Sequence, residues 1–207
     1  MSDPKPFFTK EEIKQRVRKL KAEFLEARDP KKQYRAEMNM ALLIASSSLF
    51  FQRVWSGQDY ATHYLDVAMH NTDAYDKKII GILHDVVEDS DWTLQDLRDV
   101  GFSERIIKGI DGVTKREGES YFSFIVRCGL SGSDAIDVKL KDLKNNLDSS
   151  RLTFLPEPGA KSERKRLVYI ICYNYLVEMK KRNIKPGTSI PHIHGKIRAT
   201  KKPKAFR

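Results

Sequence analysis

The 207-residue sequence lacks the features that mark several large classes of protein. It has only two cysteines, Cys128 and Cys172, which cannot build a disulfide framework. We expect each of them to be buried as a small hydrophobic side chain in a protein of a reducing compartment. The first eight residues lack the apolar core of a secretory signal. The most apolar run, 41–51, contains three serines and is too short to cross a bilayer. These absences predict a soluble, cytoplasmic protein without membrane contact.

Acidic residues are scarce in the last quarter of the chain. Residues 161–207 contain 14 Lys and Arg but only two acidic residues, a net charge of +12, whereas residues 1–160 carry a net charge of −2. Clustered Lys and Arg favour weak, non-specific contact with nucleic acid. The segment 184–207 has one aromatic residue, Phe206, and so offers little for bases to stack on. The excess positive charge therefore lies in a C-terminal appendage and not in the protein as a whole.

The apolar residues recur at three- and four-residue spacing without a run of strict alternation, which predicts an all-α helical bundle. Thr9 and Glu12 have the spacing of a capping box, and Thr93 and Ser103 are typical N-cap residues. We expect longer helices over 9–27, 32–54, 60–67, 73–89, 118–129, 134–148 and 162–182. Hydrophobic residues make up 40% of the chain, enough for one core. We therefore expect a single domain over 1–183, with an N-terminal helical extension over about 9–30 and a basic tail over 184–207.

The most informative local motif is His84-Asp85-Val-Val-Glu88-Asp89. In a continuous helix, the three- and four-residue spacings place His84, Asp85 and Glu88 toward one side, with Asp89 one turn beyond Asp85. An imidazole and three carboxylates would then lie close together. For this motif alone, the solvated acidic end of an amphipathic helix is an equally good interpretation.

Two further segments carry polar residues in a helical context. Lys139, Asp142 and Asn146 share one line of a helix, because they are spaced at i, i+3 and i+7. A cation, a carboxylate and an amide in line suit a site for phosphate and metal, although an ordinary exposed face has the same pattern. His63, 21 residues before His84, is by itself typical of a core or surface histidine.

The order His, His-Asp, Asp resembles the HD superfamily of metal-dependent phosphohydrolases. Within it, the chain resembles the RelA/SpoT-type alarmone hydrolases from about Ser56 to Leu152. Four segments resemble the motifs of that family in the right order. They are SGQDYATHYLDVA at 56–68 (family form SGxPYxxHPxxVA), GILHDVVEDSDWTL at 81–94 (LLHDxxEDTxxTL), DGVTK at 111–115 and VKLKDLKNN at 138–146 (IKLADRLHN).

The resemblance implies one metal ion, usually manganese in this family, bound by His63, His84, Asp85 and Asp142. It also implies that Glu88 and Asp89 are a catalytic acidic pair, which orients water and transfers a proton to the leaving oxygen. The donor types agree with this, because imidazoles and carboxylates suit a first-row divalent ion, and no suitable thiols are present for a structural zinc site.

The same resemblance predicts contacts with a nucleotide substrate. Lys139 is the first candidate for a phosphate counter-ion, and Asn146 matches a position that contacts the nucleotide. Lys115 and Arg127 are further candidates, for which simple surface solvation is an equal alternative. The implied reaction removes the 3′-pyrophosphate from guanosine-3′,5′-bis(diphosphate).

Departures from the family pattern fall near the expected substrate contacts. Tyr64 replaces the usual proline, 143–145 replace Arg-Leu-His, and Val54-Trp55 replace an Arg-Lys pair. None of them removes an expected metal ligand. Two alternatives therefore stay open: hydrolysis of another nucleotide, such as a deoxynucleoside triphosphate or a phosphorylated dinucleotide, or a catalytically weak protein that binds nucleotide or nucleic acid. The sequence indicates nothing about oligomeric state.

Overall fold

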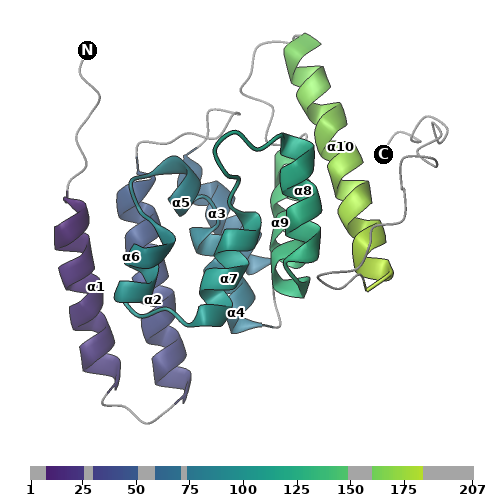
Figure 1. The fold of residues 1–207 in the computed structure, drawn as a ribbon. Coiled ribbons are helices and arrows are strands. Elements are labelled where there is room, and N and C mark those ends of the chain that lie inside the picture. The colour runs from purple at the N-terminus through teal and green to yellow at the C-terminus, as the bar shows by residue number, and fades with distance from the viewer. Residues whose placement is uncertain (1–7, 26–29, 51–58, 71–73, 149–159, 184–207) are drawn as a thin grey trace, which may run out of the picture.

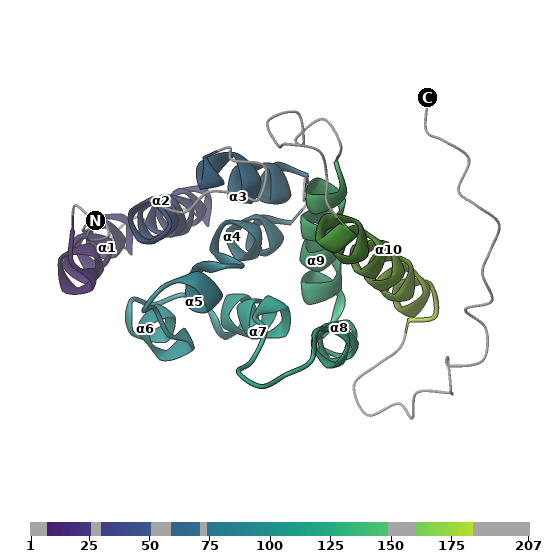
Figure 2. The ribbon, with the colours of Figure 1, turned by 90° about the horizontal axis from the view of Figure 1, so that it is seen from above.

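The computed structural model describes residues 8–25, 30–50, 59–70, 74–148 and 160–183, which form a helical bundle (Figures 1 and 2). The expected all-α class is confirmed. The helices of the described residues are α1 (Lys10–Leu25), α2 (Pro30–Ser48), α3 (Tyr60–Met69), α4 (Tyr75–Leu83), α5 (Val86–Asp89), α6 (Leu94–Asp99), α7 (Glu104–Val113), α8 (Tyr121–Leu130), α9 (Ser133–Leu147) and α10 (Ala160–Lys181).

Helix α4 lies at the centre of the bundle. It packs against α2 and α3, and also against α7 and α9, while α1 forms one side through α2 and α10 forms the other through α8 and α9 (Figure 2). Its residues Ile79, Ile80, Ile82 and Leu83 are all buried. The C-terminal end of α4 therefore lies inside the molecule, and the chain that follows it starts from a buried position.

The helix starts follow the expected caps. Glu12 Oε2 accepts a hydrogen bond of 2.7 Å from Thr9 N–H at the start of α1. Thr93 and Asp96 form a complete capping box at α6, and the Ser103 hydroxyl accepts a hydrogen bond from Ile106 N–H at α7. These side chains bind backbone donors that a helix start leaves unpaired. The predicted caps at Thr9, Thr93 and Ser103 are confirmed.

One predicted helix is broken into two in the structure. The helix predicted over 73–89 is interrupted at His84 and Asp85, so that α4 ends at Leu83 and α5 begins at Val86. The imidazole Nδ1 of His84 hydrogen-bonds the carbonyl of Gly81 at 2.7 Å. In a continuous helix this carbonyl would accept from Asp85 N–H. The His84 side chain therefore replaces a backbone bond at the point where the helix breaks.

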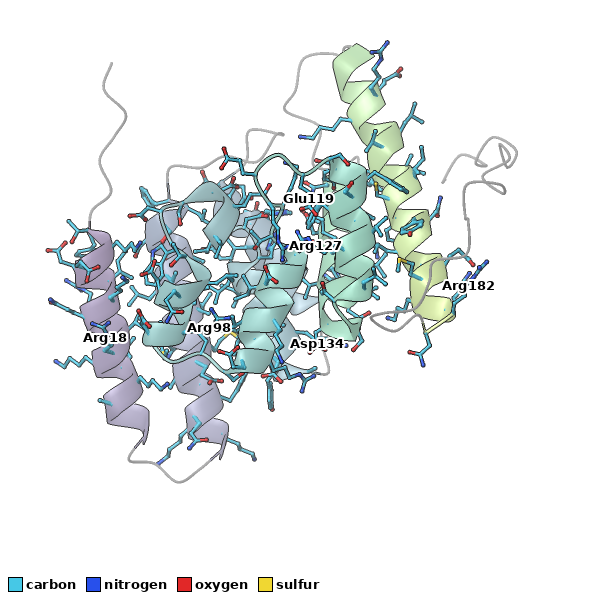
Figure 3. All side chains as sticks on the ribbon, in the orientation of Figure 1. Arg18, Arg98, Glu119, Arg127, Asp134 and Arg182 are labelled. Atoms are coloured by element: carbon cyan, nitrogen blue, oxygen red, sulfur yellow. The ribbon has the colours of Figure 1, made fainter. Side chains whose placement is uncertain are left out.

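The other helices, the cysteines and the charged surface can be compared directly with their predictions. The bounds of the remaining long helices agree with prediction to within about three residues, except that the helix expected over 32–54 ends at Ser48. Residues 26–27, 51–54 and 73 lie outside the described residues, as does the expected tail 184–207. Cys128 and Cys172 are free and buried, as predicted. Charged side chains such as Arg18, Arg98 and Arg182 stand on the outside of the bundle (Figure 3). Among the described helices, none combines the length and apolar character that a membrane span requires.

Candidate metal centre

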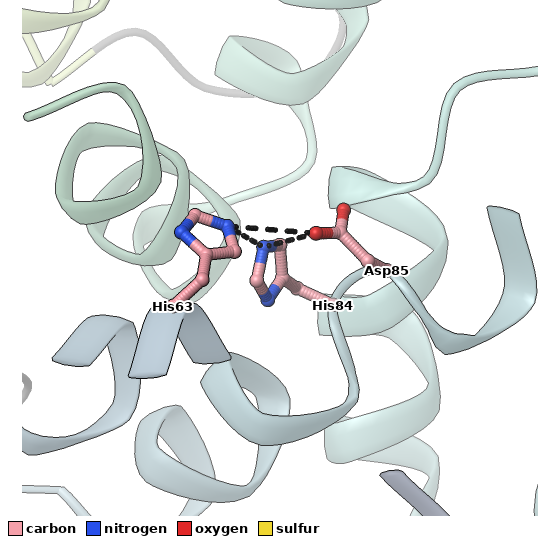
Figure 4. Close-up of side chains that lie close together, drawn as sticks. All are labelled: His63, His84 and Asp85. Atoms are coloured by element: carbon pink, nitrogen blue, oxygen red, sulfur yellow. Dashed lines mark hydrogen bonds and ion pairs between the residues drawn. The ribbon is translucent and has the colours of Figure 1, made fainter. Parts of the chain in front are cut away.

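Three separate segments bring four of the predicted residues together. His63 comes from α3, His84 and Asp85 from the break between α4 and α5, and Asp142 from α9. His63 Nε2 lies 3.2 Å from His84 Nε2 and 3.3 Å from Asp142 Oδ1. His84 Nε2 lies 2.8 Å from Asp85 Oδ2 (Figure 4). His63 and Asp142 are each 3% exposed and His84 is fully buried, so this cluster lies in the protein interior.

Each imidazole is held by a bond to its other nitrogen. The carbonyl of Gly81 can only accept, so His84 Nδ1 carries a proton and Nε2 is the nitrogen that faces the cluster. Asn145 Oδ1 lies 2.7 Å from His63 Nδ1, while the Asn145 amide donates to the Asp66 carboxylate. Because that carboxylate can only accept, the Asn145 oxygen faces His63, and His63 Nδ1 is the donor. Both Nε2 atoms therefore face the cluster as potential ligands.

The electrostatics of the cluster also favour a cation. Burial opposes a charged imidazole, but hydrogen bonds to Asp142 and Asp85 outweigh it and raise the pKa of His63 to about 10. Burial likewise opposes the ionised carboxylates, yet His84 and His63 hold the pKa of Asp85 well below its usual range. The two Nε2 atoms lie 3.2 Å apart beside two carboxylates, and this contact is repulsive unless a proton or a cation lies among these atoms. The donor set and its geometry fit a divalent metal ion.

Tyr60 is a site residue that the sequence analysis did not single out. Its hydroxyl donates to the Asp85 carboxylate and also lies 3.3 Å from Asp89 Oδ2. Burial and the charge of Asp85 raise the pKa of Tyr60, so the phenol stays protonated and remains a donor. Tyr60 and Asn145 both lie inside the quoted motifs. Each is three residues from an expected metal ligand, Tyr60 from His63 and Asn145 from Asp142, and this helical spacing could have indicated that they lie at the site.

Glu88 and Asp89 lie on α5 beside the cluster, and both are exposed. Partial desolvation and the nearby carboxylates of Asp85 and Glu88 raise the pKa of Asp89 to about 6. Glu88 Oε2 accepts a hydrogen bond of 2.9 Å from the backbone N–H of Lys115, in the segment that follows α7. The acidic pair is thus positioned by two different neighbours, Tyr60 for Asp89 and the Lys115 backbone for Glu88.

The predicted phosphate contacts make bonds within the protein. Lys139 is 7% exposed, and its Nζ lies 2.6 Å from Asp142 Oδ2 and 4.8 Å from the centre of the Phe124 ring. The Asn146 amide donates to Asp142 Oδ1. The expected polar line of α9 is therefore present and converges on Asp142. Lys115 is half-buried. That Lys115 and Lys139 contact a substrate phosphate stays a prediction.

Arg127 lies on α8, half-buried, and its guanidinium contacts Glu119 and two backbone carbonyls. Its role as a phosphate counter-ion stays a prediction.

No family model matches the chain. A solved structure described as a metazoan ortholog of SpoT, which hydrolyzes ppGpp and plays a role in starvation responses, matches it with a TM-score of 0.57 and 18% sequence identity. The match covers 72% of this chain and 96% of that chain. The chain shares the fold of that structure. The fold that the four motifs led us to expect is therefore confirmed, and the cluster of His63, His84 and Asp85 could hold a metal ion.

Proposed function

We propose that this chain is a metal-dependent nucleotide hydrolase whose substrate is guanosine-3′,5′-bis(diphosphate). The observation that carries the proposal is the convergence of two imidazole nitrogens and two carboxylates beside Glu88 and Asp89. The fold shared with a protein described as hydrolysing ppGpp supports this substrate class. In the reaction, water attacks the phosphorus bonded to the ribose 3′ oxygen, that bond breaks, and the products are GDP and pyrophosphate.

A divalent ion, manganese by the family resemblance, would be held by His63, His84, Asp85 and Asp142. When bound, such an ion supplies Lewis acidity that polarises a phosphoryl oxygen and acidifies water. The protein contributes the fixed orientation of the ligands. His63 Nδ1 is held by Asn145, and Lys139 pairs with the oxygen of Asp142 that does not face His63, so neither ligand can rotate without losing a bond.

The acidic pair is assigned to proton transfer. Glu88, whose carboxylate is oriented by Lys115 N–H, takes a proton from the attacking water. Asp89 has a pKa raised to about 6, so it is protonated more often near neutral pH than an ordinary aspartate, and in this form it gives its proton to the departing 3′ oxygen. Loss of either group is expected to cost about 10²–10⁴ in rate, as is typical of general acid–base catalysis.

The test is a hydrolysis assay on the purified full chain supplied with Mn²⁺, with GDP and pyrophosphate identified as products. Asp85→Ala is expected to abolish turnover without changing the helical circular dichroism, because it removes a carboxylate from the cluster. Asp91→Ala, an exposed carboxylate just beyond α5, is the matched control and is expected to retain activity.

A nucleotide panel separates the alternatives. Turnover of a deoxynucleoside triphosphate or a phosphorylated dinucleotide, with no release from guanosine-3′,5′-bis(diphosphate), would overturn the proposed substrate. Binding without turnover of any nucleotide by the folded chain would overturn the hydrolase and favour a nucleotide-binding protein.

A further inference from the structure

Arg127 spans the connection between α7 and α8. Its Nε and Nη2 donate to the two carboxylate oxygens of Glu119 at 2.9 and 2.8 Å, in the paired geometry that suits a guanidinium. Nη1 donates to the carbonyl of Asp111 at 2.9 Å, and Nη2 donates to the carbonyl of Thr114 at 2.7 Å. All three guanidinium nitrogens are therefore bonded inside the protein, between the end of α7 and the start of α8.

The Thr114 carbonyl and the Lys115 N–H belong to the same peptide unit. Arg127 donates to its oxygen, and its N–H donates to Glu88 Oε2 at 2.9 Å. A trans peptide is planar, so its carbonyl and N–H point in opposite directions, and holding the oxygen also sets the direction of the N–H. A rotation of this peptide would break both hydrogen bonds together.

We propose that Arg127 is a positioning residue for Glu88: by holding the Thr114–Lys115 peptide, it aims the Lys115 N–H at the Glu88 carboxylate. The inference rests on the proposed function insofar as Glu88 takes part in proton transfer. It differs from the expectation that Arg127 contacts a substrate phosphate, because its side chain is 20% exposed and already bonded to four acceptor oxygens.

The arrangement persists at neutral pH. The hydrogen bonds from Arg127 lower the pKa of Glu119 to about 2, so this carboxylate stays ionised and keeps the guanidinium in place. A lysine could not reproduce the arrangement, because its single ammonium lacks the planar fork that reaches a carboxylate and two carbonyls together.

The first test measures the peptide itself and needs no substrate. Amide hydrogen exchange of Lys115 is compared in the full-length wild type, Arg127→Met and Glu88→Ala. We expect exchange at Lys115 to become at least about tenfold faster in both variants, because each loses one of the two bonds that hold the peptide. Arg105→Met is the matched control, since Arg105 also pairs with a carboxylate but lies exposed on α7 with Asp134. Unchanged Lys115 exchange in folded Arg127→Met would overturn the proposal.

If Arg127→Met does not fold, Arg127→Lys retains the charge and is expected to give the same accelerated exchange. Protection equal to wild type in that folded variant would equally contradict the proposal.

The second test uses kinetics in a double-mutant cycle. Arg127→Met is expected to lower kcat by about tenfold to 100-fold with KM nearly unchanged, because a carboxylate is misplaced while substrate contacts are kept. In the Glu88→Ala background, the same change is expected to cost little more. A raised KM with unchanged kcat would indicate phosphate contact, and additive losses would indicate a role independent of Glu88; either result overturns the proposal. If the wild type hydrolyses no nucleotide, the proposed function fails, while the exchange experiment still decides the role of Arg127.

Discussion

At the scale of single residues, each imidazole of the candidate metal centre is oriented by a different acceptor. His84 uses the carbonyl of Gly81, three residues before it, and so needs no other segment. His63 uses the side-chain oxygen of Asn145, 82 residues later in the chain, and Asn145 is held in turn by Asp66. The direction of His63 Nε2 therefore depends on an amide that is buried between α3 and α9.

Replacing Asn145 by leucine tests this dependence. Leucine fills about the same volume as asparagine but offers no acceptor to His63 Nδ1–H. In Asn145→Leu the ring therefore loses the hydrogen bond that sets its tautomer. We expect about a tenfold to 100-fold weaker affinity for Mn²⁺, as is usual for loss of a group that orients a ligand. Titration calorimetry measures it, with Asn174→Leu, an exposed position on α10, as the control. Equal affinities in Asn145→Leu and wild type would rule out the orienting role.

At the scale of helices, the close approach of α3 and α4 sets the distance between the two histidines. A Cβ added at Gly81 would lie 3.0 Å from Ala68 Cα, a backbone atom that cannot move aside alone. Gly81 lies three residues before His84, and Ala68 lies five residues after His63. Any side chain at Gly81 must therefore separate the two helices close to the candidate metal centre.

Gly81→Ala is expected to destabilise the fold by about 1–3 kcal/mol through overpacking and to weaken Mn²⁺ binding as well. Urea unfolding and metal titration measure the two effects. Gly129→Ala is the matched control, because the added Cβ there meets the far end of the Met179 side chain, which can rotate away. Equal losses in the two variants would mean that the α3–α4 distance has no special importance.

A second helix contact joins α1 to the start of α6. Lys14 Nζ lies 2.5 Å from Asp96 Oδ1, and Lys10 Nζ lies 2.8 Å from Asp96 Oδ2, which also caps α6 with Thr93. Burial opposes the ionised form, but Lys10, Lys14 and Thr93 outweigh it and hold the pKa of Asp96 well below its usual range. The native state thus favours the ionised carboxylate more than the unfolded chain does.

The contribution of Asp96 to stability should depend on pH. Its pKa in the unfolded chain is about 3.9, so the contribution is fully present above about pH 4 and is lost as the pH falls toward the native value. The difference in urea midpoint between wild type and Asp96→Asn should be largest near pH 7 and shrink below about pH 4. Asp99→Asn, on the exposed side of α6, serves as the control. A difference that stays constant down to pH 2 would contradict this assignment.

The sequence predicted the helical class, the caps and the motif residues because all of these depend on local spacing. It did not predict the break at His84, because the 3.6-residue period continues through it and only the imidazole bond to Gly81 reveals it. It also missed Asn145, since its partners His63 and Asp66 lie 82 and 79 residues away in the sequence. Contacts between distant segments are set by the packing of α3 on α9, which no local pattern contains.

At the scale of the whole molecule, the charge is unevenly distributed along the chain. Residues 184–207 contain seven Lys and Arg and no acidic residue, whereas residues 1–160 carry a net charge of −2. All the residues assigned to the metal centre and to proton transfer lie within that nearly neutral part. We therefore expect catalysis and any contact with nucleic acid to be separable by truncation.

A chain ending at Asn183 tests the separation. It is expected to retain kcat for nucleotide hydrolysis within about twofold, because no group of the metal centre is removed.

The full chain is expected to bind single-stranded RNA weakly at low salt, with a slope of log affinity against log salt no steeper than about −5, the limit for seven cations. The truncated chain should lose this binding, and a full-length variant with the seven basic residues changed to serine should lose it equally. RNA binding that survives both changes would place the contact on the helical bundle, where Lys180, Lys181 and Arg182 at the end of α10 would be the next residues to change.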